Sequence, residues 1–222
     1  MNSVDTYEIF GENYTLPSIE DEASFTKRRI IMESTILFAK KGYAGVSMRD
    51  IGQHTGIKPA SLYYHFSSKE ILWNTVIDHA LKLYFLYHNN LDKTLKEADS
   101  FEEVVQIMFH EPSMMRNVFA CYAFALIQTE QFSDKLAGKT YLNVFLKYGI
   151  NFHKKWFDTC IERGLVQPFD TGMTATIFVQ TVLSSITLKV QETLDQELPY
   201  DFSEIFDKLQ DCIMRKALIP KI

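Results

Sequence analysis

The sequence predicts an all-α protein, and three observations support this fold class. Apolar residues recur at intervals of three and four along most of the chain, as they do on the buried face of a helix. Only 9 Gly and 6 Pro occur among 222 residues, too few for the many turns of a β fold. The composition is 46% hydrophobic and 14% aromatic, which is ample for a packed core. From these patterns we expect about nine helices and no internal repeat.

The net charge of −5 conceals three parts of different charge. Residues 1–23 contain six acidic residues and no Lys or Arg, whereas residues 24–75 contain eight basic residues and three acidic ones. Residues 76–222 contain 15 basic and 19 acidic residues. Because salt screens charges beyond about 10 Å at 0.1 M, a polyanion would respond to the local basic segment rather than to the total. We therefore predict an acidic N-terminal arm, a basic domain and an acidic helical domain with these boundaries.

Capping residues mark the first two helices of the basic domain. An apolar stripe predicts a helix over Phe25–Lys41. Ser47 with Asp50 three residues later has the spacing of a capping box, which starts a second helix. Gly56 suits the left-handed position that ends such a helix.

A short third helix and a long fourth helix follow. Pro59 fits the first position of a helix over about residues 58–65, where its missing N–H costs nothing. Ser67 with Glu70 repeats the capping-box spacing and predicts a long helix that runs to about Asn90 or beyond. Further helices are expected at roughly 101–109, 113–128, 134–163, 171–194 and 202–217.

The second and third helices, separated by a glycine-containing turn, predict a helix-turn-helix, whose second helix enters the DNA major groove. Leu62 is the inward residue of the third helix, and residues 63–65 are three consecutive ring-bearing side chains. They cannot all face inward, because successive side chains on a helix turn by about 100°. Packing against a neighbouring helix is the alternative interpretation for each of them, but an exposed ring beside Lys58 and Lys69 favours DNA binding.

The side chains of this segment suggest their DNA contacts. Hydroxyl, ammonium and guanidinium groups suit phosphate oxygens, as do the N–H groups at a helix start. These candidates are Ser47, Arg49, Tyr63, Tyr64, His65 and Lys69. Small side chains can meet a thymine methyl group, and a serine can bond to a base or a phosphate. These candidates are Pro59, Ala60 and Ser61.

Five segments of the basic domain match a known family: Ile30–Phe38, Phe38–Tyr43, Ser47–Ile51, Thr55–Ile57 and Ser61–Glu70. Through them, residues 26–75 resemble the DNA-binding domain of the TetR family of transcriptional regulators. The resemblance implies phosphate contacts by Ser47, Arg49, Tyr63, His65 and Lys69, supported by Tyr43. It also implies that the groove is faced by Lys58, Pro59, Ala60, Ser61 and Tyr64. Gly52, where the family commonly has Ala, and Lys58, where a Ser or Thr cap is usual, depart from the pattern.

The resemblance further implies that the long fourth helix joins this domain to a divergent helical domain that binds a small molecule and dimerises. The segment from Thr171 to Leu188 carries no charge, and a helix that is apolar or small all round is buried on more than one side. A helix internal to the core is the alternative interpretation. The expected dimer interface comprises Ile177, Phe178, Thr181, Val182, Ser185, Ile186, Phe202, Ile205, Phe206, Leu209 and Ile213.

An apolar effector pocket is expected on the helices that surround the ligand in this family. Its candidates combine aromatic bulk with polar tips, although each one taken singly could be an ordinary core residue. They are Tyr84, Tyr87, His88, Met108, His110, Met115, Phe119, Tyr122, Phe145, Tyr148, Phe152 and Trp156.

The sequence argues against an enzyme, a metal site and a cofactor. His110-Glu111 begins like a zinc-binding His-Glu-x-x-His motif, but Met114 occupies the second His position and Pro112 interrupts the helix. Nucleophile elbows, phosphate loops and dinucleotide-binding motifs are absent from the sequence. Three dispersed cysteines, no leader-like segment and no apolar run of 18 residues predict a cytoplasmic location.

The predicted function is that of a homodimeric repressor released from a palindromic operator by a small apolar or aromatic effector. The alternatives are an activator of the same family and a helical interaction protein without an effector. We expect the acidic arm to pack on its own or the partner subunit, or else to lie over the basic face and compete with DNA. The effector, the operator and the regulated genes are not encoded in any recognisable pattern.

Overall fold

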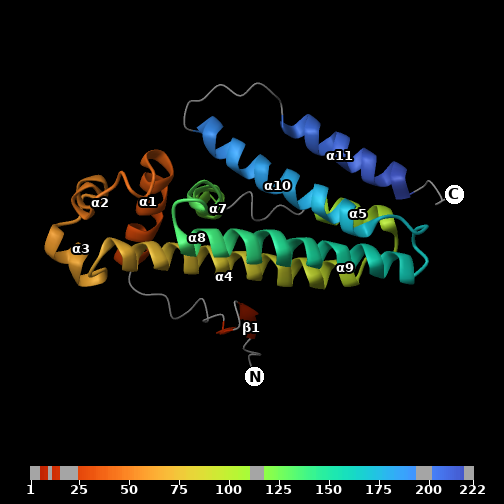
Figure 1. The fold of residues 1–222 in the computed structure, drawn as a ribbon, viewed down its shortest axis with the longest axis horizontal. Helices are drawn as coiled ribbons and strands as arrows, with labels where there is room; N and C mark the ends of the chain where they lie inside the picture. Colours follow the sequence, from red (N-terminus) through yellow and green to blue (C-terminus); the bar gives the residue numbers. More distant parts are fainter. Residues whose placement is uncertain (1–5, 10–11, 16–24, 111–117, 194–201, 218–222) are drawn as a thin grey trace. The chain divides into compact units, whose positions relative to one another are not determined.

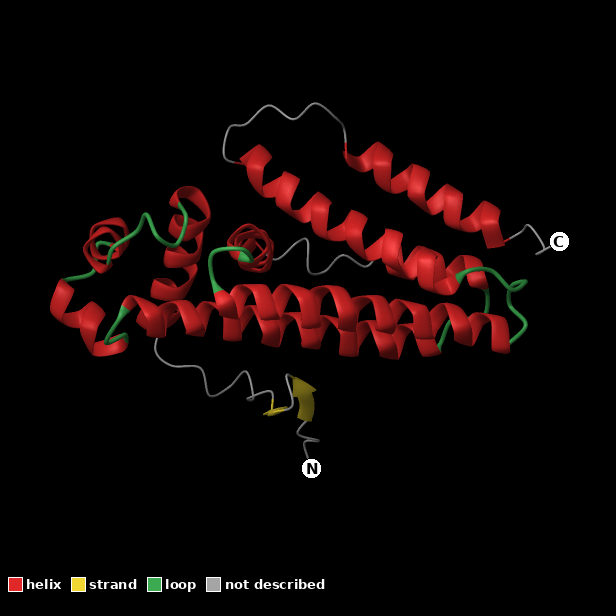
Figure 2. Cartoon of the chain, in the orientation of Figure 1, coloured by secondary structure: helices red, strands yellow, loops and turns green. Residues whose placement is uncertain are grey.

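The computed structural model describes residues 6–9, 12–15, 25–110, 118–193 and 202–217. Helix dominates these residues, as the sequence predicts (Figures 1 and 2). The described part also contains two strands that were not expected, β1 (Thr6–Ile9) and β2 (Glu12–Thr15). They pair antiparallel with Tyr7 opposite Tyr14 in the predicted acidic arm. Four residues per strand are too few for a recognisable alternating pattern.

The first three helices begin and end where their caps predict. They are α1 (Phe25–Lys41), α2 (Met48–Thr55) and α3 (Pro59–His65). The capping box at Ser47 is confirmed, because its hydroxyl accepts from the Asp50 N–H and the Asp50 carboxylate accepts from the Ser47 N–H. Gly56 follows α2 with φ +67°, the left-handed conformation that glycine adopts without strain. Lys58 precedes α3 without a side-chain capping bond.

The long helix α4 (Lys69–Lys96) is capped one residue later than predicted. The Ser68 hydroxyl, not that of Ser67, accepts the Ile71 N–H at 3.2 Å. The sequence offers two adjacent serines with the same capping chemistry, so only the backbone path after α3 distinguishes them. The helix extends six residues past Asn90, the lower limit of its predicted end.

The remaining helices follow the predicted order. They are α5 (Phe101–His110), α7 (Val118–Glu130), α8 (Lys135–Lys139), η2 (Thr140–Tyr148), α9 (Gly149–Glu162), α10 (Thr171–Thr193) and α11 (Phe202–Ala217). The run from α8 to α9 is continuous and corresponds to the single helix expected at 134–163. Its middle segment η2 is a π-helix, which residue propensities did not predict. Counted as one, this run brings the described helical segments to nine.

The chain divides into two compact units. The first comprises Met1–Leu83 and Tyr122–Val144, so most of α7 belongs to the same unit as the helix-turn-helix. The second comprises Tyr84–Cys121 and Phe145–Ile222. The domain boundary near residue 75 stays a prediction.

In the second unit the latter part of α4 lies beside α9 (Figure 1). Ring centroids of Phe85 and Tyr148 are 5.1 Å apart, and those of His88 and Phe152 are 4.7 Å apart. Both numbers of each pair rise together, so the two helices run parallel. A Cβ added to Gly149 would lie 2.6 Å from the hydroxyl oxygen of Tyr84, so glycine permits this close approach.

Helix α10 packs on α9, and α11 contacts α5 and α10. Among the described residues, one stretch, Thr171–Glu192 of α10, is long and apolar enough to cross a membrane by length and composition. This is weak evidence, because core helices pass the same test. Phe178, Leu183 and Ile186 of α10 are indeed buried within the second unit.

Candidate nucleic-acid interface and aromatic cluster

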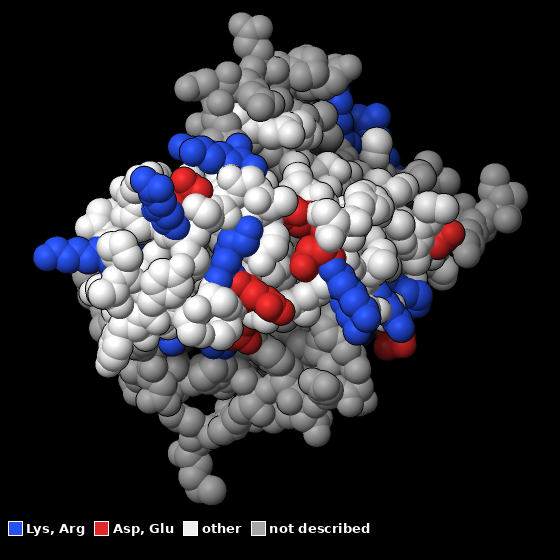
Figure 3. Space-filling view, turned by 60° about the vertical axis from the view of Figure 1, so that its left-hand side comes forward, with Lys and Arg blue, Asp and Glu red and all other residues white. Residues whose placement is uncertain are grey.

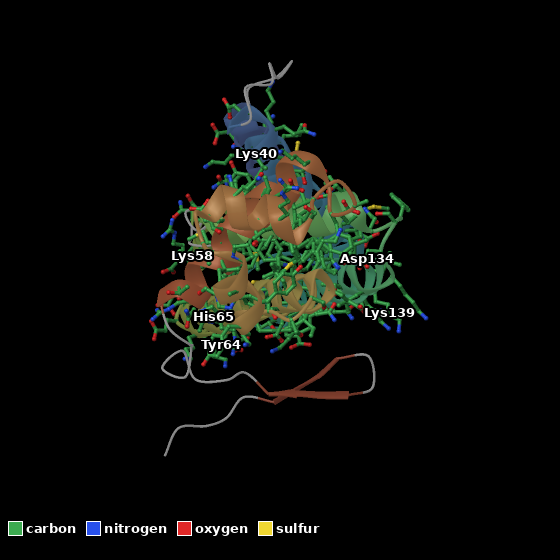
Figure 4. The ribbon with its side chains drawn as sticks, turned by 90° about the vertical axis from the view of Figure 1, so that its left-hand side faces the viewer. Lys40, Lys58, Tyr64, His65, Asp134 and Lys139 are labelled. Atoms are coloured by element: carbon green, nitrogen blue, oxygen red, sulfur yellow. The ribbon has the colours of Figure 1, made fainter. Side chains whose placement is uncertain are left out.

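Helix α3 is anchored by one side chain and exposes most of the others. Leu62 is 1% exposed, whereas Tyr63 and Tyr64 are 52% and 86% exposed. Lys58, the cap residue, is also exposed. Figure 4 labels Lys58, Tyr64 and His65 on the same side of this unit. A nearly fully exposed tyrosine on a well-packed helix is typical of a binding surface rather than of a core.

The positions around these rings are polar or basic. Pro59, Ala60 and Ser61 in the first turn of α3 are exposed, as is Arg49 near the start of α2. His65 is half-buried, with its ring centroid 5.2 Å from that of Tyr64. In Figure 3 Lys and Arg side chains border a largely uncharged area on the face brought forward. Aromatic and hydroxyl groups surrounded by cations suit a phosphate backbone and base edges.

Ser47 is exposed, but its hydroxyl already has partners. It donates to the Asp50 carboxylate and accepts the Asp50 N–H. Hydrogen bonds from Ser47 lower the pKa of the Asp50 carboxyl below its usual value, so this acceptor stays ionised. The hydroxyl would have to turn away from Asp50 to donate to a phosphate.

Tyr43 and Lys69 form a closely packed pair. The Lys69 ammonium donates to the Tyr43 carbonyl at 3.0 Å and lies 4.2 Å from the centroid of the Tyr43 ring. That ring packs on Trp73 at 4.8 Å between centroids. An ammonium carries three N–H donors, so Lys69 can bind a phosphate while it keeps this bond. Burial, Glu70 and Asp134 raise the pKa of the Tyr43 phenol, which therefore remains a donor.

Glu130, at the end of α7, is a residue of this site that the sequence did not reveal. Its Oε1 accepts the Tyr43 N–H at 2.8 Å, and its Oε2 accepts the Ser133 hydroxyl. Tyr43 and Glu130 are 87 positions apart in the sequence. No local pattern links them, so only the tertiary structure could reveal the contact.

In the second unit the structure gathers part of the predicted effector pocket into one aromatic cluster. His88 of α4 is at its centre, with ring centroids 4.2 Å from Tyr84, 5.1 Å from Tyr87 and 5.5 Å from Tyr148. The cluster consists of Tyr84, Tyr87, His88, Phe145, Tyr148 and Phe152, together with His153, which the sequence did not single out.

The other pocket candidates are not in ring contact with this cluster in the described residues. Met108, Phe119 and Trp156 are buried in the second unit, whereas Tyr122 is half-buried in the first. Met115 and the side chain of His110 lie outside the described residues.

The two histidines of the aromatic cluster are buried and neutral. The Nδ1 atom of His88 lies 2.9 Å from the Tyr84 carbonyl, and that of His153 lies 2.8 Å from the Gly149 carbonyl. A carbonyl only accepts, so Nδ1 carries the proton and Nε2 offers a lone pair. Burial lowers the pKa of His88 to about 3 and that of His153 to about 4. The Nε2 of His88 has no hydrogen-bond partner among the described residues.

The predicted interface residues divide between two environments. Phe178, Ser185, Ile186 and Ile213 are buried within the chain, whereas Thr181, Val182 and Leu209 are half-buried. The exposed face of α10 instead contains Met173, Ile177, Gln180 and Ser184, with Ile177 at 41%. The side chains of Phe202, Ile205 and Phe206 lie outside the described residues.

Known proteins share both the helix-turn-helix and the fold. Residues 30–75 match the sequence profile of the bacterial regulatory proteins of the tetR family. Over 65 residues the chain is 42% identical to IcaR of Staphylococcus aureus strain Newman, a negative transcriptional regulator of the biofilm operon icaADBC. This match covers 29% of the chain and 33% of IcaR, so the chain spans about a third of the length of the curated relatives it matches.

Solved structures match most of the chain. The TetR family regulator PfmR from Thermus thermophilus has a TM-score of 0.59 and 23% identity, covering 84% of this chain and 97% of PfmR. AibR, in complex with isovaleryl coenzyme A and operator DNA, has a TM-score of 0.59 and 18% identity, covering 83% of this chain and 95% of AibR.

The helix-turn-helix and the all-helical fold together define a DNA-binding regulator of transcription. This class of protein regulates without catalysing a reaction. With residues 30–75 matched to its DNA-binding domain, the chain belongs to the TetR family.

Proposed function

We propose that the protein is a homodimeric repressor that binds a palindromic operator in the cytoplasm and is released by a small effector. The observation that carries this proposal is α3, which exposes Tyr63 and Tyr64 while Leu62 anchors it. The description of IcaR as a negative regulator supports the choice of repressor over activator.

In this proposal α3 enters the major groove, with Lys58, Pro59, Ala60, Ser61 and Tyr64 facing base edges. Phosphates would be bound by Tyr43, Ser47, Arg49, Tyr63, His65 and Lys69. For Ser47 the geometry favours the backbone N–H groups at the start of α2, because its hydroxyl is bonded to Asp50. A twofold dimer then needs half-sites about 34–36 Å apart or a multiple of this spacing.

Operator binding is tested by selecting duplexes from a random-sequence pool with the full-length protein. We expect a palindromic sequence to be enriched and to show a footprint on both half-sites. A reporter placed behind this operator should be repressed, whereas an activator would raise its expression. A protein that enriches no duplex would be a helical interaction protein, the second alternative.

The exposed face of α10 supports dimerisation. Met173 and Ile177 are 56% and 41% exposed there, and apolar groups at such positions favour a partner helix. We propose that this face meets the partner subunit, together with Thr181 and Val182 at its side and Leu209 of α11. Phe178, Ser185, Ile186 and Ile213 would support it from within.

Substituting Ile177→Glu should produce monomers. It would place a charge in the proposed interface while leaving the buried side of α10 intact, unlike a substitution at Ile186. The measurement is mass by sedimentation or light scattering, with Leu142→Glu as the control because Leu142 is 57% exposed in the first unit. A dimer that survives Ile177→Glu would contradict the proposed face.

The effector proposal rests on the aromatic cluster. Its rings offer an apolar, aromatic environment, and the unpartnered Nε2 of His88 offers an acceptor. An aromatic molecule with one O–H or N–H group would satisfy both. AibR, which shares the fold, binds isovaleryl coenzyme A, so an acyl thioester is the alternative class to screen by operator release.

A further inference from the structure

The contact between Tyr43 and Glu130 joins two distant segments of the first unit. Tyr43 lies between α1 and α2, and Glu130 is the last residue of α7. The Tyr43 N–H donates to the Glu130 carboxylate at 2.8 Å. Gly42, with φ +75°, turns the chain here, and a Cβ on it would lie 3.5 Å from the same carboxylate oxygen.

The Glu130 carboxylate is held from both sides. While Oε1 accepts from Tyr43, Oε2 accepts from the hydroxyl of Ser133. The backbone N–H groups of Ser133 and Asp134 donate to the Glu130 carbonyl at 3.0 and 2.9 Å, which closes the turn after α7. The carboxylate is therefore fixed in orientation rather than free to rotate.

The position of Tyr43 in turn determines the position of Lys69. The Tyr43 carbonyl accepts from the Lys69 ammonium, and the Tyr43 ring lies beneath it. The ring itself packs against Phe38 and Trp73, at 5.5 and 4.8 Å between centroids. A displacement of Tyr43 would thus move two proposed phosphate contacts together.

We propose that Glu130 is a positioning residue for DNA binding, through which the end of α7 holds Tyr43 and Lys69 in register with the phosphate backbone. This inference rests on the proposed DNA-binding function. Glu130 does not touch DNA in this arrangement, and its negative charge by itself would oppose a polyanion. The hydrogen bond, not the charge, is what the site requires.

The two contributions can be separated by substitution. Glu130→Gln keeps an oxygen that accepts the Tyr43 N–H and removes the charge, whereas Glu130→Ala removes both. Ser133→Ala leaves the carboxylate in place but removes the donor that orients it. Glu162→Ala, at an exposed carboxylate at the end of α9, is the matched control.

Affinity for the duplex selected by the wild-type protein is measured for each variant over a series of salt concentrations, together with Tm. We expect Glu130→Ala to weaken binding about tenfold and to make the slope of log K against log salt shallower by about one, the value of one lost phosphate contact. Glu130→Gln and Glu162→Ala should bind within about twofold of wild type, and Ser133→Ala should be about threefold weaker.

Wild-type affinity and slope for Glu130→Ala would overturn the inference, as would a loss of affinity with an unchanged slope and a lowered Tm. Glu130→Gln as weak as Glu130→Ala would show that charge matters instead of the hydrogen bond, and would also overturn it. If Glu130→Ala does not fold, unchanged binding by Ser133→Ala has the same meaning. In all these outcomes the wild type binds DNA; a wild type that binds no duplex overturns the proposed function itself.

Discussion

Raising the salt concentration from 50 to 200 mM should weaken operator binding by roughly 10²- to 10³-fold. The proposed cationic phosphate contacts include Arg49, Lys58 and Lys69, which gives about four to six per dimer. Each releases counterions, so log K falls with log salt with a slope near −0.9 per contact. This steep dependence is expected although the whole chain carries a net charge of −5, because the local surface of the first unit is basic.

Arg49→Ala provides the residue-specific form of this test. Arg49 is exposed, so its loss should remove a phosphate contact without disturbing the packing of α2. The slope should become shallower by roughly 1.8, from one contact in each subunit. Arg163→Ala, an exposed substitution in the second unit, is the control and should leave the slope unchanged. Binding that ignores salt would contradict the proposed interface.

Acidification from pH 7 to pH 5 should lower the free energy of unfolding by about 4 kcal/mol. Burial lowers the pKa of His88 to about 3 and that of His153 to about 4, whereas an unfolded histidine titrates near 6.5. Below pH 6.5 the unfolded chain therefore binds protons that the folded chain refuses. Stability is complete above this pH and falls by up to about 1.4 kcal/mol per pH unit for each histidine.

Denaturant unfolding at a series of pH values measures this effect. His88→Asn keeps a side-chain N–H for the Tyr84 carbonyl and removes the titration, so its unfolding free energy should depend about half as steeply on pH. His153→Asn should behave in the same way, whatever its stability at pH 7. An unchanged pH dependence in both variants would show that the two rings are not the groups responsible. Since typical domains are stable by about 5–15 kcal/mol, the wild type should approach unfolding near pH 5.

The helix-turn-helix could be predicted because its determinants are local. Ser47 and Asp50 are three residues apart, and Gly56 and Pro59 mark a boundary by their own backbone preferences. The choice between Ser67 and Ser68 was wrong because both carry the same cap, and neighbouring sequence does not separate them. The π-helix at Thr140–Tyr148 was missed because no residue propensity distinguishes it from an α-helix.

Longer-range features could not be predicted in the same way. Glu130 reaches Tyr43 across 87 positions, and His88 and His153 are 5.8 Å apart between centroids although they lie on different helices. The composition of α10 indicated that it is buried on more than one side, but not which residues face outward. Its exposed positions depend on the rotation of the helix against α9, which apolar residues on every side do not specify.

Gly149 gives the second unit one position that evolution or design cannot easily change. A Cβ there would lie 2.6 Å from the Tyr84 hydroxyl oxygen and 3.5 Å from a Val179 methyl carbon, so even alanine would force neighbouring atoms to shift. Diverging descendants of this chain could vary the aromatic cluster to recognise new effectors while retaining this single glycine. Comparison of such descendants would then show an invariant residue with no ligand contact, next to recognition residues that differ from one lineage to another.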